Sequence, residues 1–190
     1  MDRKPFRQRL PEDQEKQRTP MTNTETTQPQ TTPPDPQTQT PDRLNAMLYW
    51  LASVLWVIWG LVHVLAGVMT ISKDTGAASA GIADAVDPAD LEMAYHPAVG
   101  AILNQHGFNL LWAGLVTTIA AIFVWRRAKL AVIYASVVSG SFDLGYFLFM
   151  DLGGHVKFIP GTLMTLICAT AIILSLVALS RTKTHYAEYA

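Results

Sequence analysis

Two ionisable side chains lie inside stretches that are otherwise typical of membrane-spanning helices. Asp143 lies within "SGSFDLGYFLFMDLGG" (139–154) and His63 within "WVIWGLVHVLAGVMTI" (56–71). An unpaired carboxylate at the centre of a membrane costs about 2.5–3.5 kcal/mol on insertion scales, so Asp143 is expected to face the protein interior beside a partner or water. A carboxyl group and an imidazole in contact can share a proton or hold a small polar ligand.

The two side chains are expected to lie at the same depth in the membrane. Asp143 precedes Asp151, which we place at the outer boundary, and His63 precedes Ile71, at the outer end of its own span. With a helical rise of about 1.5 Å per residue, both side chains lie roughly 12 Å below the outer surface. We therefore predict that His63 and Asp143 form a buried polar site in the outward half of the protein.

Further polar residues line the expected approach to this pair from outside. On the second span, Gln105 and His106 fall within about 60° of Asn109 at 100° per residue, so all three can share one helical face. Asn109 is expected to orient a ligand or water at the pair. The complete predicted site comprises Asp143, His63, Asn109, His106, Gln105, Tyr146, Asp151 and His155.

The residues around the pair are expected to be mainly apolar. Trp56 and Trp59 share a helical stripe with His63, at spacings of three and four, and we favour packing for them over an aromatic wall around a ligand. Stretches 120–123 and 172–174 offer only apolar side chains, so polarity is expected in the outward half alone.

The elements that must position these residues are membrane-spanning helices. Half of the 190 residues are hydrophobic, and the net charge of −1 gives no electrostatic support for binding nucleic acid. About 20 apolar residues in a helix cross a hydrocarbon core roughly 30 Å thick, and a helix satisfies its own backbone hydrogen bonds. The sequence thus predicts an all-α polytopic membrane protein, a four-helix transmembrane bundle over residues 44–181. Its spans are expected at about 46–71, 105–125, 130–151 and 160–180.

The segments outside the spans differ in character. Residues 1–43 are polar and rich in Thr, Gln and Pro, which predicts a disordered tail. The sequence does not decide between Met1 and Met21 as the start. We expect an outward loop over residues 72–104, containing a short helix capped by Asp87, and a polar tail over residues 182–190.

Basic residues in short loops predict the orientation, because they prefer the cytoplasmic side. Four spans bring six basic residues to one side: Arg43, Arg126, Arg127, Lys129, Arg181 and Lys183. We expect a multi-pass protein of the cell membrane, a bacterial inner membrane, with both termini cytoplasmic. Its expected partners are the lipid bilayer and either another membrane protein or a second copy of the chain.

In helix number and size, residues 44–181 resemble small four-span bacterial membrane proteins of the DoxX-like type. This resemblance implies a layout and no activity. Three functions stay open: a small-ligand or proton-linked membrane protein, a non-catalytic accessory or structural subunit, and a membrane metal or redox protein. No HExxH, CxxC or paired-His motif occurs, so we assign no metal ligand. The sequence identifies no cofactor and leaves open whether the protein is an enzyme.

Overall fold

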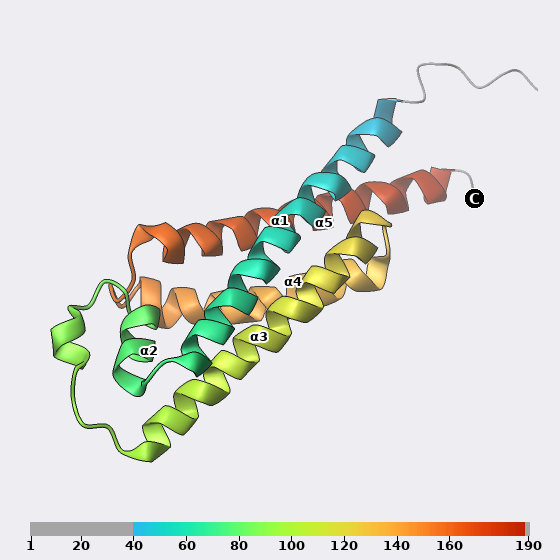
Figure 1. The fold of residues 1–190 in the computed structure, drawn as a ribbon. Helices are drawn as coiled ribbons and strands as arrows, with labels where there is room; N and C mark the ends of the chain where they lie inside the picture. Colours follow the sequence, from blue (N-terminus) through green and yellow to red (C-terminus); the bar gives the residue numbers. More distant parts are fainter. Residues whose placement is uncertain (1–39, 189–190) are drawn as a thin grey trace, which may run out of the picture. The chain divides into compact units, whose positions relative to one another are not determined.

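The structure of the protein, a computed structural model, describes residues 40–188, and the side chains of residues 43–182. This part of the chain is helical with no β-strand, so the all-α prediction is confirmed. The elements are α1 (Thr40–Ser72), α2 (Thr75–Ile82), the 3₁₀ turn η2 (Pro88–Leu91), α3 (Pro97–Trp125), α4 (Lys129–Tyr146), the π-helical turns η3 (Phe147–Asp151) and η4 (Phe158–Thr162), and α5 (Leu163–Glu188) (Figure 1). The predicted disordered tail lies almost entirely outside the described residues.

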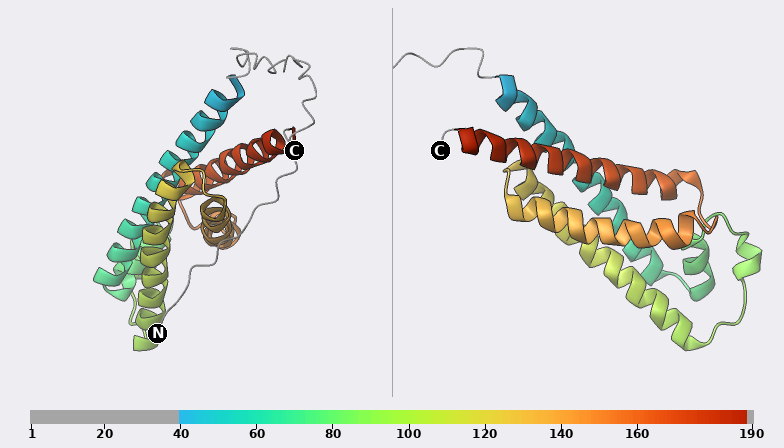
Figure 2. Two further views of the ribbon diagram at one scale, coloured as in Figure 1. Left: turned by 90° about the vertical axis from the view of Figure 1, so that its right-hand side faces the viewer. Right: turned by 180° about the vertical axis from the view of Figure 1, so that it is seen from behind.

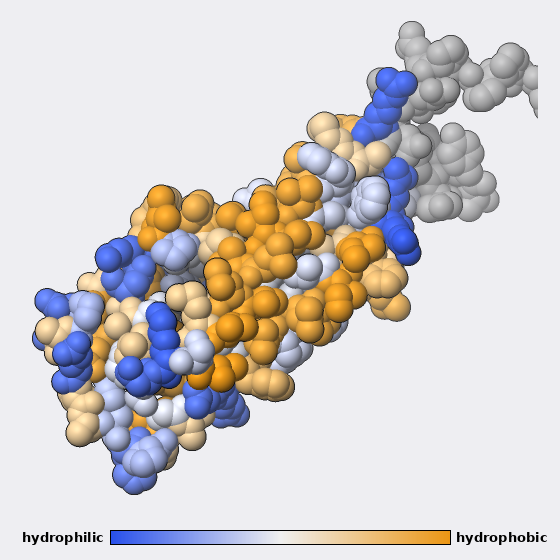
Figure 3. Space-filling view, viewed as in Figure 1, coloured by the Kyte–Doolittle hydropathy of each residue, from blue (hydrophilic) through white to orange (hydrophobic). Residues whose placement is uncertain are grey.

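Four helical segments are long and apolar enough to cross a membrane. They are Arg43–Ser72, Pro97–Trp125, Lys129–Asp151 and Phe158–Thr182, and the shortest has 23 residues. At about 1.5 Å per residue, this shortest segment exceeds a hydrocarbon core of about 30 Å. A belt of hydrophobic side chains, orange in Figure 3, separates hydrophilic ends. The chain is a multi-pass integral membrane protein.

The helices extend beyond the predicted spans. α3 begins at Pro97, eight residues before the expected 105, because His96 caps it: the Nδ1 atom of His96 accepts a hydrogen bond from the Ala98 N–H at 3.2 Å. Likewise α1 begins at Thr40 and α5 continues to Glu188. The span limits predicted from the sequence were based on the thickness of the hydrocarbon core. A helix, however, ends where its terminal backbone N–H and C=O groups find other hydrogen-bond partners.

The segment between α1 and α3 contains two short capped helices and is attached to the turn between α4 and α5. As predicted, Asp87 caps a short helix, η2, by accepting a hydrogen bond from the Ala89 N–H at 3.0 Å. Asp74 caps α2 in the same way. The Lys157 N–H donates to the Asp84 carboxylate at 2.7 Å, which fastens the loop after α2 to the α4–α5 turn.

The four long helices pack in a ring. α1 packs against α3 and α5, and α4 packs against the same two helices, so α1 and α4 lie diagonally across the bundle (Figure 2). We call the two ends of the bundle the basic end and the loop end. The basic end holds the start of α1, the α3–α4 turn and the residues near 181, with Arg43, Arg126, Lys129 and Arg181. The loop end holds α2, η2 and the turn at 151–157.

Glycines bring α1 and α3 into backbone contact. A Cβ atom on Gly114 would lie 2.5 Å from the carbonyl oxygen of Gly60, and one on Gly67 would lie 2.5 Å from that of Gly107. In each helix the two glycines are seven residues apart, which places them on one face. Small residues of this kind allow transmembrane helices to approach closely. This contact defines the register of α1 against α3.

Candidate functional site

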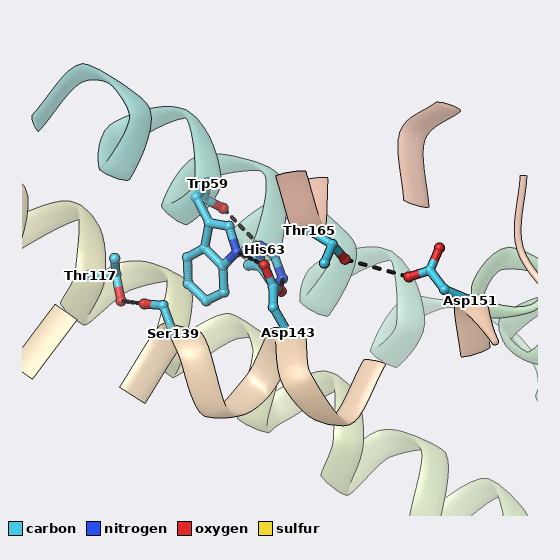
Figure 4. Close-up of polar contacts among 7 residues, drawn as sticks. All are labelled: Trp59, His63, Thr117, Ser139, Asp143, Asp151 and Thr165. Atoms are coloured by element: carbon cyan, nitrogen blue, oxygen red, sulfur yellow. Dashed lines mark hydrogen bonds and ion pairs between the residues drawn. The ribbon is translucent and has the colours of Figure 1, made fainter. Parts of the chain in front are cut away.

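His63 and Asp143 meet inside the bundle. The Nε2 atom of His63 lies 3.7 Å from Oδ1 of Asp143, and the two side chains are only 12% and 8% exposed (Figure 4). His63 comes from α1 and Asp143 from α4, the two diagonal helices, so the contact crosses the centre of the bundle. The predicted meeting of these two side chains is therefore observed, and neither is turned toward lipid.

Trp59 contacts both members of the pair. Its indole N–H donates a hydrogen bond to Oδ2 of Asp143 at 2.9 Å, and its ring stacks on the imidazole of His63 with centroids 3.7 Å apart. The sequence favoured packing for Trp59 over an aromatic wall around a ligand, and it did not predict the hydrogen bond to Asp143. The available signal was the four-residue spacing to His63, together with the need of a buried indole N–H for an acceptor.

The hydrogen bond at Nδ1 of His63 indicates which of its nitrogens carries a hydrogen. Its Nδ1 atom lies 2.8 Å from the backbone carbonyl oxygen of Trp59, and a carbonyl oxygen only accepts, so Nδ1–H is the donor. In the neutral ring, Nε2 then carries a lone pair and faces the Asp143 carboxyl group. A neutral imidazole and an ionised carboxylate would present two lone pairs to each other. The two groups become complementary when one proton lies between them.

Each of the four long helices contributes to the surroundings of the pair. From α5, the thiol of Cys168 lies close to the Asp143 carboxyl group. From α3, Gly114 leaves room for His63, because a Cβ atom there would lie 3.0 Å from the Cβ of His63. His106, also on α3, is near enough to His63 to interact with it electrostatically.

Three other predicted residues lie apart from His63. Asn109 accepts a hydrogen bond from the indole N–H of Trp112 at 3.3 Å, and it lies on the side of α3 turned away from α1. Gln105 is exposed on that same side of α3. His155 is exposed in the turn that follows η3. The predicted common face of Gln105, His106 and Asn109 therefore does not reach the imidazole as a unit.

The remaining predicted residues close the loop end. The carboxylate of Asp151 accepts hydrogen bonds from the hydroxyls of Thr162 and Thr165, which ties η3 to the start of α5. The hydroxyl of Tyr146 packs against Gly161, where a Cβ atom would lie 2.7 Å from it. These contacts join α4 and η3 to η4 and the start of α5, one to two turns beyond Asp143, and they lie outside the pair itself.

Polar groups are also buried in the half of the bundle nearer the basic end. The expectation of polarity in the outward half alone is therefore wrong. Three hydrogen bonds join different helices there: Trp56 to Ser175 at 3.0 Å, Thr117 with Ser139 at 3.0 Å, and Asn45 to Thr182 at 3.0 Å. A search for uncharged segments does not detect such groups, because Ser and Thr carry no charge and lower the mean hydropathy of a segment only slightly. The spacing of three and four residues along α5, at Cys168, Ala171, Ser175 and Ala178, was the usable signal.

In the part of the chain that the structure describes, no group of three or more His, Cys, Asp or Glu side chains is arranged to hold a metal ion. Comparison of the chain with protein-family models, curated proteins and solved structures gave no match. The geometry of the pair is therefore the main indication of function.

Proposed function

We propose that this integral membrane protein binds and releases a proton within the membrane, at the pair formed by His63 and Asp143. The observation that carries the proposal is the 3.7 Å distance between Nε2 of His63 and the sheltered carboxyl group of Asp143, while Nδ1 of the same ring bonds to the Trp59 carbonyl oxygen. Two such groups attract each other in a medium of low dielectric constant only when they hold one proton between them.

Trp59 supports both positions of that proton. When the proton is on His63, the imidazolium stacks on the indole face, a favourable cation–π arrangement, and Asp143 is the counter-ion. When the proton is on Asp143, the indole N–H still donates to the other carboxyl oxygen. Trp59 is thus a positioning residue for the pair.

In the orientation expected from the basic residues, the loop end nearest the pair faces outside.

The proposal is tested by pH-dependent infrared difference spectroscopy on the purified protein in detergent. We expect a carboxyl C=O band that appears and disappears with pH in the wild-type protein and is absent from Asp143→Asn. Asparagine retains an oxygen that accepts from Trp59, so the fold is expected to persist. Asp151→Asn is the matched control, because Asp151 is on η3 and bonds to threonines. A titrating band that survives in Asp143→Asn and disappears in Asp151→Asn would refute the assignment.

Replacing the imidazole tests whether the proton is shared. His63→Gln is expected to shift the pH at which the Asp143 band titrates, because the basic partner is lost. The exposed His155→Gln is expected to leave that titration unchanged. Equal titration in wild type and His63→Gln would show that Asp143 titrates alone and would remove His63 from the site.

A role as a structural or accessory membrane subunit is the second candidate. The hydrogen bonds that join different helices, such as Trp56 to Ser175, support it because they stabilise a bundle without any chemistry. This role predicts a folded Asp143→Asn variant and no titrating carboxyl band in the wild-type protein. The infrared measurement therefore separates the two candidates.

A further inference from the structure

We infer that the proton bound at the pair continues to the basic end through buried polar side chains, so that the protein conducts protons across the membrane. The inference rests on the proposed function of His63 and Asp143 and extends it from a binding site to a route. We call the side chains of this route the polar row: Thr117, Ser139, Ser136, Ser175 and Asn45.

The row begins directly below Asp143 on α4. Ser139 and Ser136 precede Asp143 by four and seven residues, about one and two helical turns toward the basic end. Ser136 points within about 20° of the direction of Asp143 at 100° per residue. The hydroxyl of Ser139 is buried and lies 3.0 Å from the hydroxyl of Thr117 on α3 (Figure 4). Either of these two oxygens can donate to the other, as a proton relay requires.

Two unpartnered oxygens belong to the same row. Among the described side chains, the buried polar atoms without a hydrogen-bond partner are Oγ of Ser136 and Oδ1 of Asn45. A buried polar atom of this kind is the usual position at which an ordered water binds. Asn45 is 7% exposed, lies near the basic end and donates through its amide to Thr182. The two atoms therefore mark positions for water between the pair and the basic end.

A hydroxyl on α5 faces the same interior. Ser175 follows Cys168 by seven residues and so shares the face that meets Asp143. The indole N–H of Trp56 donates to Oγ of Ser175 at 3.0 Å, so the hydroxyl hydrogen of Ser175 stays available to another acceptor. The indole has no acceptor atom, and Trp56 therefore orients Ser175 without carrying the proton.

The transfer leaves each side chain unchanged. A hydroxyl oxygen or a water accepts a proton on the side of Asp143 while its own hydrogen passes to the next oxygen toward the basic end. Each O–H group then turns back before the next proton. Water bridges the steps of about 6 Å between successive turns of α4. The electrochemical gradient of protons drives the flow, and no oxidant or reductant takes part.

Proton flux into liposomes tests the route. The full-length protein is reconstituted with a pH-sensitive dye inside, and a potassium diffusion potential is imposed with valinomycin. We expect potential-driven acidification with wild-type protein. We expect Ser139→Ala, Ser136→Ala and Thr117→Val each to slow it about tenfold, as when a hydrogen bond of ordinary strength is lost from the transfer step.

Controls come from exposed hydroxyls of the same residue types that bond within their own helices. The exposed Ser141 on α4 donates to the carbonyl of Val137 in its own helix, and the exposed Thr170 on α5 donates to that of Leu166. Ser141→Ala and Thr170→Val are expected to conduct at the wild-type rate. Far-UV circular dichroism establishes that each variant is folded, and Thr117→Val provides a nearly isosteric change beside the two Ala variants.

The outcomes separate this inference from the function on which it rests. A titrating Asp143 band in a protein that conducts no faster than empty liposomes overturns the route and leaves the proton-binding pair intact. Wild-type conduction in folded Ser139→Ala, Ser136→Ala and Thr117→Val also overturns it, as does equal slowing in the controls. Absence of the Asp143 band refutes the proposed function itself.

Discussion

The two interfaces of α1 use different chemistry. Toward α3, α1 presents Gly60 and Gly67, and the backbones of the two helices touch. Toward α4 and α5 it presents Trp56 and Trp59, whose indole N–H groups reach across to Ser175 and Asp143. The first interface is thus close enough for backbone contact at its glycines, and the second contains two fully buried tryptophans.

The difference shows how a buried carboxyl group is held in this bundle. The backbone contact with α3 defines the position of α1, and the tryptophans then span the wider gap to α4 and α5. We call the contact of α1 with α3 the narrow interface and its contact with α4 and α5 the wide interface. Because Trp59 bonds to Asp143 and stacks on His63, the site depends on the wide interface for its contacts and on the narrow interface for its alignment. Variants of each interface are expected to separate these two contributions.

The largest effect is expected at the narrow interface. Gly114→Ala places a methyl group 2.5 Å from the Gly60 carbonyl oxygen, and because the clash is with backbone it is expected to destabilise the fold by about 3 kcal/mol or more through overpacking. Gly145→Ala is the matched control, since a Cβ atom there meets nothing within 4 Å. That change is expected to stabilise the helix by up to about 1 kcal/mol. Reversible unfolding in mixed detergent micelles, followed by circular dichroism, measures both; effects of the same sign would contradict the close contact.

At the wide interface, the tryptophans provide a paired comparison. Trp59→Phe leaves one oxygen of the buried Asp143 carboxyl group without its donor. If that group is ionised, we expect the free energy of unfolding to fall by about 1.5–3 kcal/mol. Trp56→Phe loses a hydrogen bond between neutral groups, and the expected loss is about 0.5–1.5 kcal/mol. Both rings are fully buried, so the lost volume is comparable. The same unfolding experiment applies. Equal costs would indicate that Asp143 is protonated throughout in the folded protein.

The smallest effect is expected for the hydroxyl contact between α3 and α4. Thr117→Val removes the hydrogen bond to Ser139 with little change in shape and is expected to cost about 0.6 kcal/mol, the mean for such bonds between membrane helices. Thr170→Val, at an exposed position, is the reference. A cost above about 2 kcal/mol would exceed the range measured for such bonds and would point to a mainly structural role for Thr117.

Much of the site followed from the sequence because depth in a membrane is set by residue number. The rise of a helix placed His63 and Asp143 at one level, and the structure joins them. Rotation about the helix axis was less predictable. Angular spacing around α3 put Gln105, His106 and Asn109 on one face of the helix. The identities of these three residues do not show which face of α3 meets α1. The glycines at 107 and 114 carry that information, through a contact between backbones.

The sequence by itself determined that this chain is a helical membrane protein with an acid and an imidazole at matching depth, because composition and helical rise are local properties. Only the tertiary structure decided that Trp59 joins them, that polar groups continue toward the basic end, and that Gln105 and Asn109 lie apart from His63. Those outcomes depend on how four helices are rotated against one another. That rotation is selected by packing between segments distant in the chain, which local patterns do not record.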